Sequence, residues 1–401
     1  MSRRPTPDNT IGESIQLRRR ARGWSVRYAA DRAGIAHTTW SRIERGLIAA
    51  DNRFTLAAIA EALECSVPDL TSQPGAPADR ESAEVDARVR AIRQALVEAD
   101  LDEEPTCDPR PIETLREELA LVADLRRRCD YAGVGHLLPR LIQELHAATF
   151  GADRAEALAL LVEAAYVAAG TVRYVSSPAE AWLAAERCRQ AARPLDDPVL
   201  LALAEHERAH AATSSGAYVR GLAIASRAAD GLQRHLAAPN AIEMLGMLHL
   251  TCAFAAIGAK DPGQVTARLD EADALAERTG DTTTLGMMFG PTNVRFWRVS
   301  METDAGEPGR AVELAAGTNP AAVPSPSRQV AFYTDTARAL AHTGKDDQAV
   351  RMLLTAERLS PLRVRSSRLV QETTRMLLER AQRRAGGAEL RGLCERMGLV
   401  V

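Results

Sequence analysis

Five residues near the middle of the chain have the types and spacing of a catalytic zinc site. Residues 206–210 read HERAH and fit the HExxH pattern of zinc peptidases. On a helix, His206 and His210 lie one turn apart on one face, as two zinc ligands must, and Glu207 takes the place of the general base. The chain offers neither the longer HExxHxxGxxH pattern nor a strand that would hold a substrate. We keep zinc catalysis as an alternative and predict no catalytic and no metal-ligating residue.

The composition predicts a helical protein of the cytoplasm. The 401 residues are enough for two or three domains, and aromatic residues make up only 4% beside abundant Ala and Leu, which favours helices. No run approaches 18 apolar residues without a charge, so no membrane span is expected. The charged start MSRRPTPDNT predicts no signal peptide, and the six scattered cysteines are expected to be reduced. Nothing in the sequence calls for a cofactor.

Positive charge is concentrated at the N-terminus. Residues 1–45 hold ten arginines against four acidic residues, whereas the whole chain has a net charge of −3. The rest of the chain is therefore acidic. A basic head on an acidic body indicates that only the head meets a polyanion such as DNA.

Residues 11–70 have the pattern of several short helices. The segment IGESIQLRRRARG stops at Gly23, and Ser25 is placed to cap VRYAADRAG, which ends at Gly34. The helix HTTWSRIERG follows after two residues, and a fourth helix in TLAAIAEALE is followed by a turn at VPDL. Two short helices joined by a tight turn that contains Gly form a helix-turn-helix.

These residues resemble the DNA-binding domain of the xenobiotic-response-element (XRE) family of phage-repressor-like regulators. The resemblance covers about 60 of 401 residues and is carried by Arg19, Ser25, Ala30, Gly34, the run 41–46 (SRIERG), Leu56, Ile59, Ala60 and Leu63. One departure is AADNR at 49–53, where the family often has Pro-Ser. Asp51 or Asn52 is then expected to cap the fourth helix.

The resemblance assigns residues 37–45 as the recognition helix, which enters the major groove of double-stranded operator DNA. His37, Thr38 and Arg42 are then expected to face base edges. Arg42 is the main candidate because a guanidinium can bond guanine O6 and N7 together. Other side chains are expected to contact phosphates, namely Ser25, Arg27, Thr39 and Arg45.

The opposite face of the recognition helix is expected to be structural. Trp40 and Ile43 are predicted to lie in the core of the head. The resemblance also implies a buried ion pair between Arg19 and Glu44, and removing one partner of such a pair costs roughly 3–5 kcal/mol.

The rest of the chain is predicted to be a stack of helical hairpins. We expect a helix-turn-helix domain over 1–70, a Pro/Gly/Ser-rich linker over 71–83 and an all-helical body over 84–401. Pairs of small residues seven apart recur every 38 to 46 residues: Ala181/Cys188, Gly221/Ala228, Ala267/Ala274, Ala311/Thr318 and Ala349/Ala356. The last of these units, over 333–361, resembles a tetratricopeptide repeat (TPR). The expected fold is therefore all-α, with a five-helix head followed by a TPR-like solenoid.

The repeat register predicts a groove that binds a peptide or a polar small molecule. Its candidate residues are Tyr166, Arg173, His206, His210, Asn293 and Arg338. For the two histidines a seam between helices is the alternative location. Pro291 is expected to start a helix and to leave the side chain of Asn293 free in its first turn.

Together these features predict a cytoplasmic bacterial transcription regulator. The head binds operator DNA, and the body forms a homodimer, senses an effector, or does both. The rival interpretations are an interaction scaffold with a degenerate helix-turn-helix and the zinc peptidase considered above.

Overall fold

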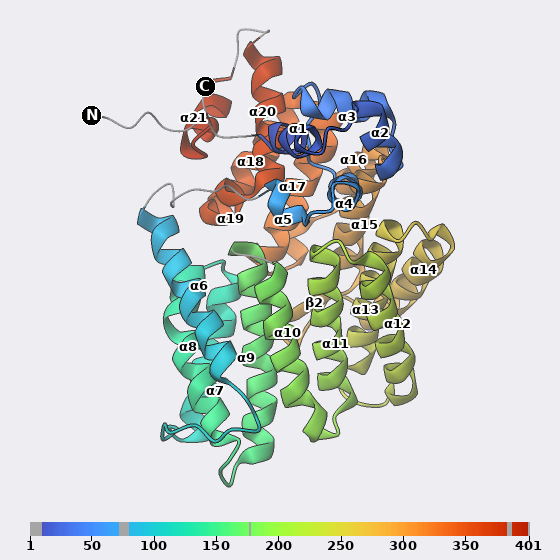
Figure 1. The fold of residues 1–401 in the computed structure, drawn as a ribbon. Helices are drawn as coiled ribbons and strands as arrows, with labels where there is room; N and C mark the ends of the chain where they lie inside the picture. Colours follow the sequence, from blue (N-terminus) through green and yellow to red (C-terminus); the bar gives the residue numbers. More distant parts are fainter. Residues whose placement is uncertain (1–9, 72–79, 176–177, 383–386, 400–401) are drawn as a thin grey trace, which may run out of the picture. The chain divides into compact units, whose positions relative to one another are not determined.

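The computed structural model describes residues 10–71, 80–175, 178–382 and 387–399. Within these ranges the chain is built almost entirely of α-helices, from α1 (Ile11–Ala21) to α21 (Ala388–Arg396) (Figure 1). This confirms the predicted all-α class.

The head contains five short helices, as predicted. They are α1, α2 (Val26–Ala33), α3 (His37–Glu44), α4 (Arg53–Ala62) and α5 (Val67–Thr71). Side chains satisfy the first N–H groups of three of them. Thr10 and Glu13 form a capping box on α1, Ser25 accepts from the N–H of Tyr28 on α2, and Asn52 caps α4. The expected cap at Ser25 is thus confirmed, and of the two candidates for α4 the cap is Asn52 and not Asp51.

The core of the head lies between α1, α3 and α4. Trp40, Ile15, Leu56 and Ile59 are almost fully buried there. Helix α1 approaches α3 so closely that a Cβ added at Gly12 would lie 2.3 Å from the carbonyl oxygen of Ile43. Only glycine permits this approach.

The remaining helices follow in sequence order. They are α6 (Arg80–Glu98), α7 (Ile112–Arg127), α8 (Tyr131–Ala148), α9 (Arg154–Val175), α10 (Pro178–Ala192), α11 (Pro198–Ser214), α12 (Tyr218–Leu232), α13 (Ala241–Gly258), α14 (Pro262–Thr279), α15 (Pro291–Ala305), α16 (Pro308–Ala316), α17 (Pro326–His342), α18 (Asp346–Leu359), α19 (Pro361–Ser366), α20 (Arg368–Gln382) and α21. Short 3-10 turns lie at Arg193–Leu195, Gln233–His235 and Pro320–Ala322.

Most of the linker expected over 71–83 lies outside the described residues. Residues 72–79 are not described, Thr71 still belongs to α5, and α6 already begins at Arg80. Helix α6 thus starts four residues before the predicted helical stretch, because RESA consists of residues that a helix accommodates well.

By its packing the chain forms two compact units. The first contains residues 1–78, 302–316 and 330–401, and the second contains 79–301 and 317–329. The head therefore shares a unit with the C-terminal helices, and α15 and α17 each contribute to both units. The sequence-based division into 1–70 and 84–401 stays a prediction about domains, but it does not follow this packing.

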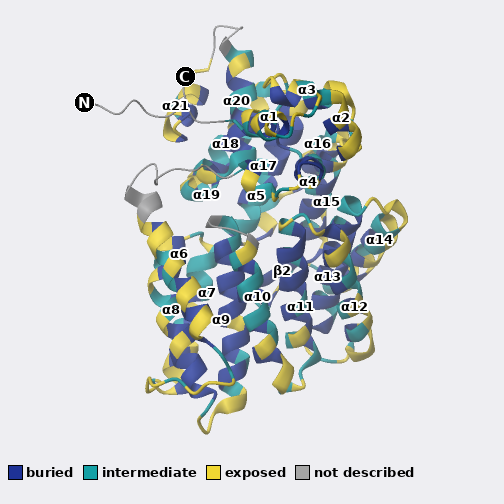
Figure 2. Ribbon diagram, in the orientation of Figure 1, coloured by how far each residue is buried: buried dark blue, intermediate teal, exposed yellow. Residues whose placement is uncertain are grey.

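The second unit is a stack of helical hairpins in two layers. Each helix from α7 to α14 packs against the next, and α7, α9, α11 and α13 also contact one another in that order, which makes them one layer (Figure 1). Helix α6 packs on α8 and α10 of the other layer. Buried residues run along α9, α11 and α13, which are dark blue in Figure 2. This is the solenoid arrangement that the repeats predicted.

The small-residue pairs mark the second helix of each hairpin, with one error of register. Four of the pairs begin at buried small residues on α10, α12, α16 and α18. Ala267 and Ala274 of α14, however, are exposed, and Ala272 and Ala276 are buried instead. The predicted register is wrong in α14 because small residues occupy both faces of that helix.

A small β-hairpin interrupts the second unit, although the sequence showed no strand pattern. Strands β1 (Thr282–Thr284) and β2 (Met287–Phe289) pair antiparallel, with Thr282 opposite Phe289. The two residues between them, Leu285 and Gly286, both have positive φ. Such a turn matches the twist of a two-stranded hairpin. The hairpin rests on α13.

Two helices, over 154–174 and 241–258, are long and apolar enough to cross a membrane. In the most apolar 18-residue stretch of each helix, 78% of the residues are buried in the first helix and 72% in the second. Both belong to the same layer of the second unit, where neighbouring helices cover them, so their apolar character is explained by packing within the stack.

Candidate nucleic-acid interface and ligand site

The recognition helix α3 has one exposed and one buried face. His37, Thr38 and Arg42, the predicted base readers, are all exposed. Trp40, Ile43 and Glu44 on the other face are buried in the head. The structure thus leaves the three predicted side chains on the accessible side of α3.

An ion pair fixes the buried face of α3 to α1. Arg19 donates two hydrogen bonds to Glu44, from Nε to Oε1 at 2.6 Å and from Nη2 to Oε2 at 2.8 Å. Trp40 Nε1 donates a third to Oε1 at 2.5 Å. Burial alone would raise the pKa of Glu44, but the hydrogen bonds from Arg19 and Trp40 hold it below its ordinary value. Glu44 therefore stays charged and orients α3.

The predicted phosphate contacts lie around the recognition helix. Ser25, Arg27 and Arg45 are exposed, and Thr39 is half-buried. The hydroxyl of Ser25 accepts the N–H of Tyr28, and its own proton remains available to a phosphate. Arg32 differs from these arginines, since it pairs with Glu64 at 3.3 Å and lies over the ring of Trp24.

A buried polar network joins the head to the C-terminal helices of its own unit. We call it the docking network, and it consists of Asp51, Arg53, Asp304, Asp335, Arg338, His342 and Thr373. Arg53, the first residue of α4, pairs with both Asp304 and Asp335. Asp51 is buried and accepts from Thr373 Oγ1 at 2.8 Å, with His342 Nε2 at 2.9 Å.

Arg338 is the centre of this network and not a groove residue, which corrects the sequence prediction. Its side chain is 2% exposed and pairs with Asp304 at 2.5 Å and with Asp335 at 2.9 Å. It also donates to the backbone carbonyl of Asp51. The TPR-like register placed Arg338 on the inner side of its helix, but in this unit the head occupies that side.

Other contacts outside the docking network also join the head to the C-terminal helices of its unit. The N–H of Ile11 donates to Glu372 at 3.4 Å, and Arg368 donates to the carbonyl of Thr71 at 3.1 Å. Leu369 packs against the apolar core of the head. The head is therefore held by side chains from α15, α17 and α20, in addition to its covalent connection.

Five of the six predicted ligand residues belong to the second unit, where they lie in or beside one polar cluster. We call it the inner cluster and define it as Arg126, Tyr166, Arg173, His206, Glu207, His210, Trp297 and Arg328. The guanidinium of Arg126 lies 4.6 Å from the ring centre of Tyr166, and Arg173 pairs with Glu207 at 2.9 Å. The rings of His206 and His210 are 4.6 Å apart, and His210 is 5.5 Å from Trp297.

The remaining predicted residue of this unit, Asn293, does not have the free side chain that was expected. It is buried, its Nδ2 donates to the carbonyl of Met288 at 2.7 Å, and its Oδ1 accepts from Arg328 at 2.8 Å. The side chain therefore connects the β-hairpin to Arg328. The hairpin, which the sequence did not reveal, brings that carbonyl within reach.

The HERAH helix lacks the surroundings of a zinc site. His206 Nδ1 contacts Thr251 Oγ1 at 3.0 Å, and Glu207 is paired with Arg173. Across the described part of the chain, no group of three His, Cys, Asp or Glu side chains is placed to hold a metal ion. The two histidines thus have no third ligand, and the carboxylate that a peptidase would use as a base is neutralised by a guanidinium.

Both histidines of the inner cluster are held neutral. Burial lowers the pKa of His206 to about 4, and Arg173 and Arg328 oppose its charged form while Glu207 favours it. Burial also lowers the pKa of His210, and the guanidinium groups of Arg173 and Arg328 lower it further.

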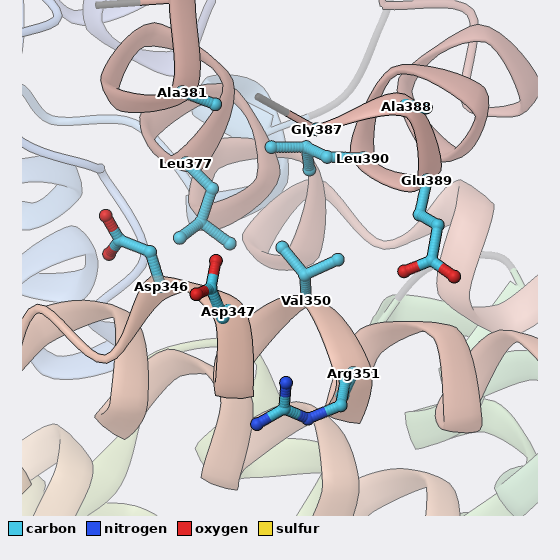
Figure 3. A pocket seen from close by; sticks show the side chains of 10 residues that line it. All are labelled: Asp346, Asp347, Val350, Arg351, Leu377, Ala381, Gly387, Ala388, Glu389 and Leu390. Atoms are coloured by element: carbon cyan, nitrogen blue, oxygen red, sulfur yellow. The ribbon is translucent and has the colours of Figure 1, made fainter. Parts of the chain in front are cut away.

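A pocket of about 400 Å³ lies in the first unit, away from the predicted residues. Figure 3 shows Leu377, Val350 and Leu390 pointing into it, with the carboxylates of Asp346, Asp347 and Glu389 around them. The acids and Arg351 lie at its open rim, and Asp346 is already paired with Arg380. The pocket contains none of the residues proposed above for a ligand.

Sequence reasoning missed Arg126, Trp297 and Arg328. A usable signal was present for Arg126, which precedes Tyr166 by 40 residues, as Tyr166 precedes His206. Equivalent positions of successive hairpins lie side by side in a solenoid. The other two could not be found in this way, because the β-hairpin shifts the spacing before α15.

Comparison with known proteins identifies the head. A family model described as a helix-turn-helix domain matches residues 10–72. Residues 10–72 are a helix-turn-helix domain. The second unit is a TPR-like stack of helical hairpins by the packing described above. A search of curated proteins finds no match to the sequence.

Two solved structures show a distant similarity. One is Bacillus thuringiensis PlcR in complex with the peptide PapR7 and DNA, at 13% identity and a TM-score of 0.30, over 88% of this chain and 99% of that one. The other is yeast Tom70, at 11% identity and a TM-score of 0.39, over 96% of this chain and 81% of that one. Neither similarity is close enough to carry an argument about this chain.

Proposed function

We propose that this protein is a cytoplasmic, bacterial transcription regulator of the XRE type, without catalytic activity. It binds operator DNA as a homodimer, and its hairpin stack senses an effector. The observation that supports DNA binding most strongly is the two-sided recognition helix. His37, Thr38 and Arg42 are exposed on one face of α3, and the other face is fixed by Trp40 and the Arg19–Glu44 ion pair.

In the proposed complex, α3 enters the major groove. The guanidinium of Arg42 bonds O6 and N7 of a guanine, and His37 and Thr38 contact neighbouring base edges. Ser25, Arg27, Thr39 and Arg45 bind phosphates on either side. Ala36 has no side chain that caps α3, so the first N–H groups of this helix are also available to a phosphate.

The dimer follows from the small size of the head. One helix-turn-helix buries little DNA surface, and two half-sites about one helical turn apart are the usual solution. Because the docking network attaches each head to C-terminal helices, the proposed dimer sets the distance between heads through the body. An effector that changes the body then changes affinity for paired half-sites without changing the bases that are read.

The test is operator binding by the full-length protein on a site selected from random duplexes. We expect Arg42→Ala to weaken binding by about 1–3 kcal/mol and to relax the preference at one base pair. Arg45→Ala is expected to weaken binding to all DNA sequences by a similar factor. It should also reduce the slope of log affinity against log salt concentration by about one. Arg32→Ala is the matched control, since Arg32 is engaged with Glu64 and Trp24, and it is expected to bind like wild type.

Two results would overturn the proposal. Unchanged sequence preference in Arg42→Ala would show that α3 is docked wrongly. The absence of any salt-dependent binding in wild type would favour the rival function, an interaction scaffold with a degenerate head. Equal affinity for one and two half-sites, together with a monomeric mass in solution, would remove the dimer from the proposal.

A further inference from the structure

The inner cluster contains more positive charge than its own carboxylate balances. Glu207 accepts from Arg173 at 2.9 Å and is thereby used as the partner of that residue. Arg126 forms no ion pair with any carboxylate in the described part of the chain. It donates to the carbonyl of Gly286 at 3.2 Å and lies over the ring of Tyr166, and the nearby carboxylate whose charge acts on it, Glu207, is already paired with Arg173. A guanidinium in such surroundings is costly unless an anion joins it.

Two hydrogen-bond donors of this cluster are also unsatisfied. Arg126 Nε and Trp297 Nε1 are buried, and neither has a hydrogen-bond partner among the described residues. Buried donors of native proteins are almost always paired. Trp297 as a whole is 8% exposed, so its indole N–H cannot turn to bulk water. A bound anion would accept hydrogen bonds from these donors and would neutralise the excess positive charge.

Aromatic rings and neutral imidazoles lie beside these donors. The rings of Tyr166 and Trp297 provide flat walls, and His206 and His210 are neutral for the reasons given above. Arg126 and His210 are only half-buried, so the cluster keeps some contact with solvent. A bare inorganic anion would leave the ring faces without a contact, whereas an organic acid would use both kinds of group.

We infer that the inner cluster is the effector site and that it takes a small organic acid, whose carboxylate binds at Arg126 and whose apolar part packs against the aromatic rings. This inference rests on the proposed function, because it names the ligand class for the effector that the regulator senses. It assigns Arg126 and Trp297 as binding residues. It leaves Asn293 the role of positioning Arg328.

The experiment uses the full-length protein with benzoate as the acid and benzamide as its neutral isostere, at constant ionic strength. Binding is followed by calorimetry and by tryptophan fluorescence. We expect benzoate to bind roughly ten- to hundredfold more tightly than benzamide, the factor that a hydrogen bond to a charged group supplies. Acetyl-phenylalanine and its amide form a second pair, which distinguishes a small acid from the carboxyl end of a peptide. Tighter binding of the acetylated amino acid than of benzoate would assign the site to a peptide terminus and overturn the small-acid inference.

Variants locate the site. Arg126→Gln is expected to lose most of the preference for benzoate over benzamide. Trp297→Phe keeps an aromatic ring but removes the N–H donor, and it is expected to weaken benzoate binding roughly tenfold. The matched control is Arg128→Gln, two residues along the chain, because Arg128 is exposed and pairs with Asp124 at 2.8 Å. It is expected to bind benzoate like wild type, and circular dichroism checks that each variant is folded.

The outcomes separate this inference from the proposed function. Equal affinity for benzoate and benzamide, no binding of either, or full preference in the Arg126→Gln variant would overturn the inference. Operator binding is measured on the same samples. If wild type binds its operator and shows no acid preference, the inference fails and the regulator stands. If it binds no DNA, the proposed function fails and the benzoate comparison still decides whether the acid site exists.

Discussion

The two units bury charged side chains in opposite ways. In the docking network, Arg53 and Arg338 each pair with both Asp304 and Asp335, so two cations meet two carboxylates. The third carboxylate, that of Asp51, is bonded by His342 and Thr373. In the inner cluster, Glu207 is paired with Arg173, and Arg126 forms no ion pair among the described residues. A balanced buried network holds helices together, whereas a buried charge without a partner is costly and marks a candidate functional site. The comparison suggests which buried charges are structural and which are functional.

The strongest test of the comparison is to remove a cation from the balanced network. Arg338→Met leaves Asp304 and Asp335 buried with one arginine fewer, and we expect the free energy of unfolding to fall by about 3–5 kcal/mol. Denaturant unfolding of the full-length chain measures this loss. Arg310→Met is the control, because Arg310 is largely exposed and pairs with Glu302 at 3.5 Å in the same unit. Its effect should stay within about 0.5 kcal/mol.

A similar small loss in both variants would show that the docking network contributes little. In that case the head would be held mainly by its apolar contact with Leu369 and by its covalent connection.

Acid separates the two regions by the pH range in which their buried groups titrate. The pKa of His206 is lowered from 6.5 to about 4, so its contribution to stability is complete above pH 6.5 and is lost as pH falls toward 4. The pKa of Asp335 is held at about 2 by Arg53 and Arg338 against the effect of burial, so the docking network persists until pH falls below the ordinary range of an aspartate. We expect the second unit to lose up to about 3 kcal/mol between pH 7 and pH 4.

Hydrogen exchange at pH 7 and pH 4.5 measures this difference unit by unit. His206→Gln removes one titrating group and should reduce the pH dependence of the second unit, where His210 and His249 also titrate, while leaving that of the first unaltered. Equal acid sensitivity in wild type and in this variant would show that another group is responsible.

The smallest effect on stability is expected when a cation is removed from the inner cluster. Arg126→Gln deletes a buried guanidinium without an ion-pair partner, so the lost contacts with Tyr166 and Gly286 are offset by the lower cost of burial. We expect the free energy of unfolding to change by no more than about 1 kcal/mol, in either direction. A loss of 3 kcal/mol or more would make Arg126 a structural residue like Arg338.

Local features of the sequence were reliable where one helix determines the outcome. The cap at Ser25 and the cap at Asn52 depend on side chains that reach their own backbone, and both were predicted. The exposed and buried faces of α3 follow from helical periodicity and from the resemblance to a known domain. The helical hairpins followed from repeated patterns of small residues, apart from α14, where Ala267 and Ala274 proved to be exposed.

The errors concern residues whose role depends on a distant partner. Asn293 was expected to be free, but the carbonyl of Met288 and the guanidinium of Arg328 occupy its side chain. Arg338 was assigned to a groove because of its helical position, although Asp51 and Asp304 lie against it. Arg126 was overlooked because an arginine at a helix end is ordinarily solvated.

The sequence by itself determined the helical class of this protein, the helix-turn-helix of residues 10–72 and the hairpin repeats that follow it. These depend on caps, periodicity and charge within a few turns of chain, where the covalent connection already limits the geometry. Only the tertiary structure decided that the head shares a unit with α17 to α20, and that the buried charge of one region is balanced while that of the other is not. Ion pairing depends on distances across segments hundreds of residues apart, such as that between Asp51 and His342, and no local pattern of residues encodes those distances.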